Sequence, residues 1–217
     1  AAGYDTLKLK VGVDCERDLR RIAAVRAALP NTVRLRLDAN GAFGDREADA
    51  VLVRLARFEP EFVEQPLATH DPGRWARLRA ASPVPIAADE AVRDEASARA
   101  LLEAGAADWL VLKPAALGGL AAAWRIAELA RASGVRIAVT SFLDSAVGRM
   151  AARQLAAALP GATAAAGLAT GALLADDLAN THDGASLAVP AEAGLGVIPD
   201  AVALARCRAG VSLDLAA

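Results

Sequence analysis

Short extended runs and amphipathic stretches alternate along the chain. In the run TLKLKVG, residues 6–12, the apolar side chains fall on one parity and Lys8 and Lys10 on the other, which is typical of a strand with two different faces. The stretch 14–31 that follows carries apolar residues at helical spacing, after the candidate N-cap Asp14. The pattern therefore predicts a strand followed by a helix as the first unit.

The same unit recurs to about residue 171, so the pattern predicts seven strands with six helices between them. The strands are expected at 6–12, 33–41, 61–66, 84–90, 108–114, 135–141 and 162–171. The helices are expected at 14–31, 45–58, 71–82, 94–105, 117–134 and 145–161. Because strands and helices alternate, we expect parallel β/α units.

The chemistry of the strands distinguishes an open doubly wound sheet from a closed barrel. Central strands of an open sheet are covered by helices on both faces and read as continuous apolar runs. Here one parity is apolar, whereas the other carries charge on several strands, as at Arg36, Asp38 and Glu64. The first strand is also not followed by a glycine-rich phosphate fingerprint. The sequence therefore predicts an α/β fold, a (β/α) TIM-type barrel, over residues 1–180.

The predicted barrel is incomplete. Seven strands are one fewer than the eight of a closed barrel, and the chain begins at Ala1, without a methionine, in what reads as the end of a helix. We therefore expect the first strand to belong to a part of the protein that precedes this sequence.

Polar residues recur near the carboxyl ends of the predicted strands. They are Lys10, Asp38, Glu64, Asp89, Lys113 and Ser141, each 24 to 28 residues after the one before. This interval is about the length of one β/α unit, so each residue occupies the same place in its unit. Active sites of barrels form at the rim where these strand ends meet.

Three of these residues, Asp38, Glu64 and Asp89, are carboxylates on consecutive strands. Carboxylates that lie close together repel one another unless a cation is bound between them. An all-oxygen set of ligands selects a hard divalent ion, so we expect Mg²⁺, with Mn²⁺ as a substitute. Each residue alone could be a helix cap, a loop residue or part of an acidic first turn. Their shared position in three units favours the metal site.

Lys10 and Lys113 flank the three carboxylates. Either lysine alone would be interpreted as a surface or salt-bridge residue, but a partly desolvated lysine beside a metal ion can act as a base near neutral pH. Such a site suits removal of a proton next to a carboxylate and stabilisation of the resulting enediolate. Lys8 lies one layer deeper. A Schiff-base aldolase is the alternative use of a barrel lysine, but it requires no carboxylates at strand ends.

Composition and charge indicate which partners and which cellular setting to expect. The 217 residues are 55% hydrophobic and carry a net charge of −2 with both signs interspersed, so neither a nucleic acid nor an anionic membrane is an expected partner. Cys15 and Cys207 are too few for a disulfide framework and indicate a reduced, cytoplasmic setting. The expected partner is a small-molecule carboxylate substrate, and the sequence gives no indication of the oligomeric state.

The motifs KLK, DAN, VEQP, ADE and LKPAALGG occur in an order and spacing that resembles the enolase superfamily, in its muconate-lactonizing subgroup. The resemblance extends over residues 3 to about 178. Within the subgroup, the segments TSFLDSAVG and GLATGALLADDL most resemble the o-succinylbenzoate synthase family. The resemblance implies an N-terminal capping domain as well, toward which residues 181–217 are expected to run.

The resemblance also implies roles for individual residues. It implies metal ligands at Asp38, Glu64 and Asp89, acid/base lysines at Lys10 and Lys113, supporting residues at Lys8, Asn40 and Glu90, and backbone contacts to a second substrate carboxylate around Gly118, Gly119 and Ser141. The implied reaction is a Mg²⁺-dependent syn elimination of water from a cyclohexadiene carboxylate, in menaquinone biosynthesis. The alternative is an N-succinylamino acid racemase, or another racemase or cycloisomerase of the subgroup.

Overall fold

The computed structural model contains one curved sheet of six parallel strands, and neighbours in the sheet are neighbours in the chain. The structure describes residues 3–161, 164–181, 184–191 and 193–208. The strands are β1 (Thr6–Lys10), β2 (Arg34–Asp38), β3 (Phe62–Glu64), β4 (Ile86–Ala88), β5 (Trp109–Leu112) and β6 (Arg136–Val139). A doubly wound sheet reverses its strand order partway, whereas this order follows the chain as in a barrel. The predicted incomplete barrel is confirmed.

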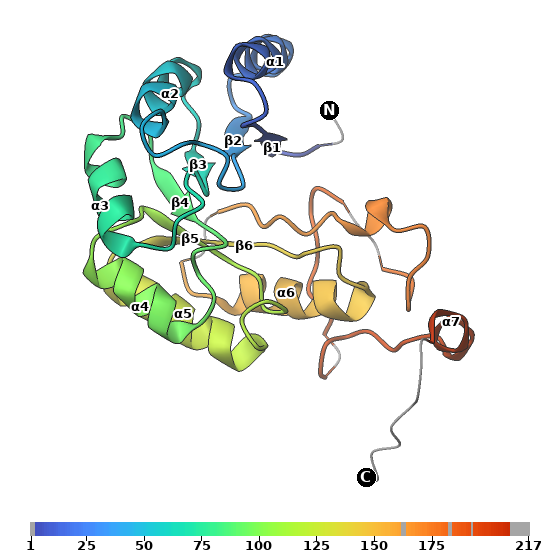
Figure 1. Ribbon diagram of the computed structural model, residues 1–217. Coiled ribbons are helices and arrows are strands. Elements are labelled where there is room, and N and C mark those ends of the chain that lie inside the picture. The colour runs from blue at the N-terminus through green and yellow to red at the C-terminus, as the bar shows by residue number, and fades with distance from the viewer. Residues whose placement is uncertain (1–2, 162–163, 182–183, 192, 209–217) are drawn as a thin grey trace.

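Helices connect the strands and cover the outer face of the sheet. They are α1 (Cys15–Ala28), α2 (Ala48–Leu55), α3 (Pro72–Ala81), α4 (Glu95–Glu103), α5 (Leu120–Ala132) and α6 (Ala146–Ala158), together with the 3₁₀ turns η1 (Ala56–Phe58) and η2 (Gly171–Leu173) and the short helix α7 (Ala201–Cys207). Figure 1 shows α1 to α5 in an arc around one side of the strands. The strand ends that carry the predicted site lie inside this arc.

Local sequence signals explain where several helices begin. The side chain of Asp14 accepts a hydrogen bond from the Arg17 amide at the start of α1. Asp94 and Ser97 form a reciprocal capping box at the start of α4. These caps satisfy amide groups that the first helical turn leaves without intrahelical partners, and they fix where each strand-to-helix loop ends.

The strand register places the charged residues in levels. Lys10 pairs with Asp38, and Asp38 pairs with Glu64, so these three residues lie at one level of the sheet. Lys8 lies two residues earlier on β1, at the level of Arg36. Because registered partners in a parallel sheet share a face, all of these side chains point to the inner side. The prediction that Lys8 lies one layer deeper than Lys10 is confirmed.

Two apolar clusters correspond to the two faces of the sheet. The larger cluster fills the space between the sheet and its helices and includes the buried residues Leu35, Leu37 and Trp75. The smaller cluster lies inside the barrel, where the rings of Phe62 and Trp109 pack with their centroids 5.1 Å apart. The level below the rim therefore holds the charged residues Lys8 and Arg36 together with the ring of Phe62, whereas the rim holds Lys10, Asp38 and Glu64.

The seventh expected strand, at 162–171, does not form as a regular strand among the described residues. Residues 162 and 163 lie outside the described part, and Gly167 makes a single parallel bridge to Thr140. The chain then turns into η2 at Gly171. Alanine and glycine, which dominate this segment, have low strand propensity, and no described strand pairs with its other edge. The prediction of seven strands was wrong by one.

The C-terminal segment contains a helix that the sequence analysis did not predict. The side chain of Asp200 accepts a hydrogen bond of 2.8 Å from the Ala203 amide and caps α7. Val202 on α7 and Ile198 just before it are largely exposed. Within the ranges that the structure describes, no helix is both long and apolar enough to cross a membrane.

Candidate active site

Five of the predicted site residues stand at the carboxyl ends of five consecutive strands. Lys10, Asp38 and Glu64 are the last residues of β1, β2 and β3, whereas Asp89 and Lys113 directly follow β4 and β5. The side chains of the three carboxylates are between 1% and 5% exposed. Burying three acidic groups in one row is costly unless positive charge accompanies them.

Lys8 supplies part of that positive charge from the level below. Its Nζ atom donates to Asp38 Oδ2 at 2.9 Å and to Glu64 Oε1 at 2.8 Å. Burial works against the charge of Lys8, but Glu64 and Asp38 outweigh it and raise the pKa of the lysine. Lys8 is therefore a direct partner of two carboxylates.

Lys10 meets the same row from the rim. Its Nζ atom donates to Asp38 Oδ2 at 2.7 Å and to Asn40 Oδ1 at 2.5 Å. Asn40, whose backbone has a positive φ of 43°, donates in turn to Glu90 Oε1 at 2.9 Å. The side chain of Lys10 remains 63% exposed, so its amine faces open space at the rim.

Lys113 holds the other end of the row. Its Nζ atom donates to Asp89 Oδ2, and the ammonium group lies 4.8 Å from the centre of the Phe142 ring. The lysine side chain is only 13% exposed. The two flanking lysines thus contact different carboxylates, Lys10 at Asp38 and Lys113 at Asp89.

Burial and mutual repulsion change the pKa values of the three carboxyl groups in different directions. Burial raises the pKa of Glu64 to about 8, and the charges of Asp38 and Asp89 add to this rise against the opposing effect of Lys8. Burial also raises the pKa of Asp89, although Lys113 opposes it. For Asp38, burial is outweighed by the nearby charges of Lys8 and Lys10, and the pKa is lowered. Added positive charge would favour the ionised form of Glu64.

The three residues expected to receive a second substrate carboxylate lie apart from these contacts. Gly118 and Gly119 end the loop before α5 with φ values of 87° and 108°, which favour glycine. A Cβ atom at either position would meet no atom within 4 Å. Ser141 lies in the loop between β6 and α6, where its hydroxyl is 3.0 Å from that of Thr170.

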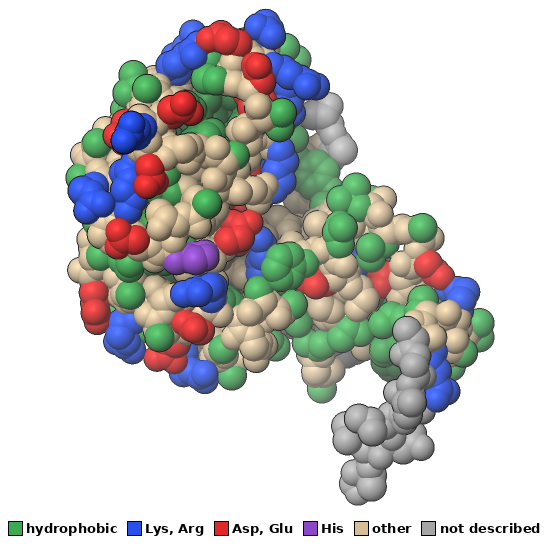
Figure 2. Space-filling model, viewed as in Figure 1, with side chains coloured by type: hydrophobic (Ala, Val, Ile, Leu, Met, Phe, Trp, Pro, Cys, Tyr) green, Lys and Arg blue, Asp and Glu red, His purple; other side chains and the backbone are tan. Residues whose placement is uncertain are grey.

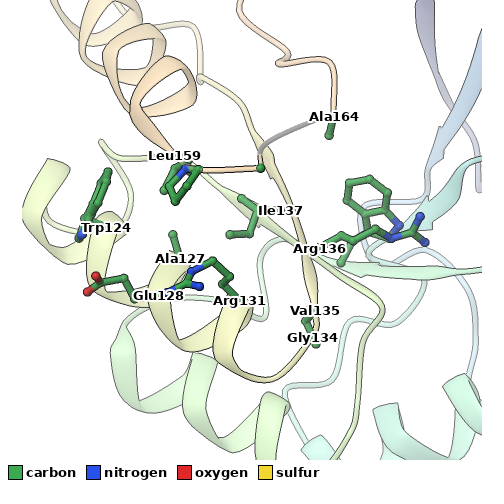
Figure 3. A pocket seen from close by; sticks show the side chains of 13 residues that line it. Trp124, Ala127, Glu128, Arg131, Gly134, Val135, Arg136, Ile137, Leu159 and Ala164 are labelled. Carbon is green, nitrogen blue, oxygen red and sulfur yellow. The ribbon is translucent and has the colours of Figure 1, made fainter.

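Two cavities lie at different parts of the barrel. A cavity of about 480 Å³ is lined by Lys8 and Glu64, among other residues, and opens between β1 and the segment 164–169. A second cavity, of about 280 Å³, lies at the amino ends of β5 and β6, where Trp109 and Arg136 begin these strands. Figure 3 shows Trp124, Ile137 and Leu159 around it, and none of the predicted site residues lines it.

The face of the molecule that Figure 2 shows carries acidic and basic side chains interspersed over the helices, and hydrophobic side chains gathered on the C-terminal part. The exposed apolar residues of that part include Leu173, Ile198 and Val202. The charges on this face are mixed, whereas the inner row brings three carboxylates together at consecutive strand ends.

The donor chemistry of the row fits a hard divalent cation. Asp38, Glu64 and Asp89 offer only oxygen atoms, which are the ligands that such an ion prefers. However, no three acidic, histidine or cysteine side chains among the described residues are arranged as a ready metal site. The reason is visible in the contacts, because Lys8 lies between two of the carboxylates and Lys113 holds the third. The residues fit the ion chemically, while their side chains are turned to the lysines.

Gln65 is a further residue of the site, which the sequence analysis did not single out. Its side chain is almost completely buried and accepts hydrogen bonds from the amides of Asp89 and Ala91. The only signal in the sequence is its position in the motif VEQP, directly after Glu64.

Comparison with known proteins gives one matching family and several relatives. The family model described as "Enolase C-terminal domain-like" matches residues 1–203. The o-succinylbenzoate synthase of Mycobacterium marinum is 40% identical over 205 residues, which cover 91% of this chain and 58% of the relative. The chain therefore spans less than two thirds of the length of this relative.

Solved structures show the same architecture. The muconate lactonizing enzyme from Pseudomonas putida is 28% identical and superposes with a TM-score of 0.88, over 94% of this chain and 58% of that one. The N-succinyl Arg/Lys racemase from Bacillus cereus is 25% identical, with a TM-score of 0.88 over 94% of this chain and 56% of that one. These enzymes share one fold although their names describe different reactions.

Proposed function

Since the chain belongs to the enolase C-terminal domain-like family, we propose that it forms the catalytic barrel of a Mg²⁺-dependent dehydratase of the o-succinylbenzoate synthase type. The observation that carries the proposal is the buried row of Asp38, Glu64 and Asp89 with Lys10 and Lys113 at its ends. The 40% identity to an o-succinylbenzoate synthase supports the same activity. In this reaction a cyclohexadiene carboxylate loses water and becomes aromatic.

The three carboxylates would hold the metal ion, with Mn²⁺ as a substitute. When bound, the ion supplies positive charge beside the substrate carboxylate, which favours the enediolate form of the substrate. Lys8 holds Glu64 Oε1 and Asp38 Oδ2 through its two hydrogen bonds, and it shares Asp38 Oδ2 with Lys10. It would thereby orient two of the three ligand side chains.

Lys10 is the proposed base. Its uncharged amine takes the proton from the carbon next to the substrate carboxylate, and the electron pair of that bond moves into the carboxylate to give the enediolate. The enediolate then expels the hydroxyl group as the ammonium of Lys10 returns the proton to it, so that water leaves from the same face. The hydrogen bond to Asn40 fixes the direction of the amine during both transfers.

Lys113 is the proposed electrostatic partner on the other side of the substrate. Its ammonium is held by Asp89 and covered by the ring of Phe142. A cation in this position stabilises the negative charge of the enediolate and lies against the face of the forming ring. We assign the second substrate carboxylate to the backbone around Gly118, Gly119 and Ser141, where glycine permits close approach.

The second candidate function is racemisation of an N-succinylamino acid. The structural likeness to the N-succinyl Arg/Lys racemase favours it as the alternative. Lysines at both ends of the row would suit this reaction, because one lysine can remove the α-proton and the other can return a proton to the opposite face. The dehydratase is preferred because the sequence identity to a synthase extends over 91% of the chain.

One experiment in D₂O separates the two functions. The protein is incubated with Mg²⁺ and either the cyclohexadiene acid or an N-succinylamino acid, and products are followed by absorbance and NMR. The dehydratase predicts an aromatic product from the first compound. Deuterium exchange with racemisation of the second compound, without any aromatic product from the first, would establish the racemase instead.

We also propose that residues 181–217 pack toward a capping domain of a longer protein. The support is the exposed apolar surface of this segment, where Ile198 is 89% and Val202 is 68% exposed. Apolar side chains of this kind commonly mark an interface. Replacing both by Lys should leave the barrel folded but weaken its association with the N-terminal portion, measured by co-purification of the two parts.

A further inference from the structure

We propose that Gln65 is a positioning residue that fixes the spacing of the three carboxylate-bearing strand ends. The inference rests on the proposed metal site and adds to it a residue that touches neither the metal nor the substrate. Gln65 directly follows Glu64 and precedes Pro66.

The backbone of Gln65 has a left-handed conformation, with φ at 42°. Few residues other than glycine adopt this region without a reason in the surrounding structure. The side chain of Gln65 is almost completely buried, and a buried amide requires hydrogen-bonding partners.

The side chain finds these partners on the neighbouring strand end and in its own loop. Its Oε1 atom accepts from the amides of Asp89 and Ala91, both at 3.1 Å. Its Nε2 atom donates to the carbonyl oxygen of Leu67 at 2.8 Å. One amide group therefore joins the loop after β3 to the segment that carries Asp89.

The backbone of the same residue makes two more connections. Its amide donates to the carbonyl of Ala87 on β4 at 2.8 Å, and its carbonyl accepts from the amide of Gly41 at 2.6 Å. Gly41 follows Asn40, the partner of Lys10. Gln65 thus binds the loops after β2 and β4 as well as its own loop, and a carboxylate stands at or directly after the end of each of these three strands.

These contacts predict an effect on metal affinity. Mg²⁺ requires near-ideal octahedral geometry with oxygens at about 2.0–2.1 Å, so the separation between ligands must be held closely. Without the Oε1 acceptor, the amides of Asp89 and Ala91 would lose their partner in a buried place, and the loop would shift to regain one. Losing a residue that orients metal ligands typically lowers metal affinity about 10- to 100-fold.

The test uses Gln65→Met, which keeps the length of the side chain but removes its acceptor and donor. Gln154→Met on α6 is the matched control, and Asp89→Asn is the reference for loss of a ligand. Mg²⁺ affinity is measured by calorimetry, and amide hydrogen exchange is measured at Asp89 and Ala91 without metal. We expect Gln65→Met to weaken Mg²⁺ binding about 10- to 100-fold and to speed exchange at both amides. Gln154→Met should change neither.

Gln65→Glu keeps two acceptor oxygens, so it should retain slow exchange at both amides. If Asp89→Asn weakens Mg²⁺ binding but Gln65→Met leaves it unchanged, the positioning role is overturned while the metal site stands. If Asp89→Asn has no effect on Mg²⁺ binding, the proposed metal site is wrong. In that case amide exchange is the only remaining test of the role of Gln65. Unchanged exchange at Asp89 and Ala91 in Gln65→Met would overturn that role.

Discussion

Lys8 and Glu64 form an ion pair at the base of the carboxylate row, with Nζ of the lysine 2.8 Å from Oε1 of the glutamate. The same ammonium also binds Asp38. In the absence of a metal ion, Lys8 and Lys10 supply the positive charge that contacts these two adjacent acidic groups. A bound divalent ion would share that role, so Lys8 and the ion both stabilise the same pair of acids.

The first prediction concerns Lys8→Met in metal-free protein. The variant leaves Asp38 and Glu64 buried without one of their cationic partners, so we expect it to lower the free energy of unfolding by about 1–3 kcal/mol. Added Mg²⁺ should recover part of this loss by supplying the positive charge. Urea denaturation with EDTA and with Mg²⁺ measures both values, and an equal loss in the two conditions would argue against a shared role. Arg99→Met, at an exposed position on α4, is the control.

The second prediction concerns the pH dependence of stability in metal-free protein. The pKa of Glu64 is about 8 in the folded state, above its ordinary value of 4.5. Between these values the folded protein binds the extra proton, so stability should fall as pH rises from about 4.5 to about 8, with a slope of at most about 1.4 kcal/mol per pH unit.

Urea unfolding at several pH values in EDTA measures this slope. Glu64→Gln carries no titrating proton at this position, so most of the slope should disappear in the variant. A variant that keeps the full slope would assign the pH dependence to other groups.

Much of the site could be predicted from the parity of the strands. Lys8, Lys10 and Asp38 lie on the polar parity, and the strand register brings them within hydrogen-bonding distance on the inner face. The spacing of polar residues at strand ends also indicated that Glu64 lies at the same level. The resemblance to the enolase superfamily, stated from the motifs, is confirmed by the family model.

Other features could not be predicted, for physical reasons. Gln65 acts across strands through a left-handed backbone conformation, which a parity pattern cannot show. The prediction of the seventh strand was wrong because strand formation in the alanine-rich segment around Gly167 depends on pairing with neighbouring strands. The local sequence pattern does not show whether such neighbours are present. The direct contact of Lys8 with two carboxylates depends on the length and conformation of its side chain, whereas the pattern of the strand predicts only its level in the sheet.

The third prediction concerns Asn40→Gly. Glycine accepts the positive φ of this position, so the change removes only the side chain that holds Lys10 and contacts Glu90. We expect kcat to fall about 10- to 100-fold, because the amine loses one of its two acceptors and its direction. Mg²⁺ affinity should remain nearly unchanged.

Steady-state kinetics and calorimetry measure the two effects of Asn40→Gly separately. Asn31→Gly, before β2 at the other end of the barrel, is the matched control and should leave both values unchanged. Loss of metal binding in Asn40→Gly would indicate that Asn40 supports the metal ligands instead of Lys10.

The fourth prediction concerns the inner apolar layer beneath the site. Phe62→Ala removes a buried ring that packs on Trp109 and lies under the guanidinium of Arg36. We expect the free energy of unfolding to fall by about 3–5 kcal/mol. Val202→Ala, at an exposed position, should change it by less than about 0.5 kcal/mol. Equal effects in denaturant titrations would mean that Phe62 is not part of a packed interior.

The most direct test of the account compares Lys10→Ala with the unaltered protein in two measurements, turnover of the cyclohexadiene acid and calorimetric binding of Mg²⁺. If Lys10 is the base and the three carboxylates hold the ion, turnover should fall by about 10²- to 10⁴-fold while Mg²⁺ affinity changes little. Substantial turnover in Lys10→Ala would contradict the assignment of the base, and failure of the unaltered protein to bind Mg²⁺ would contradict the metal site on which the mechanism depends.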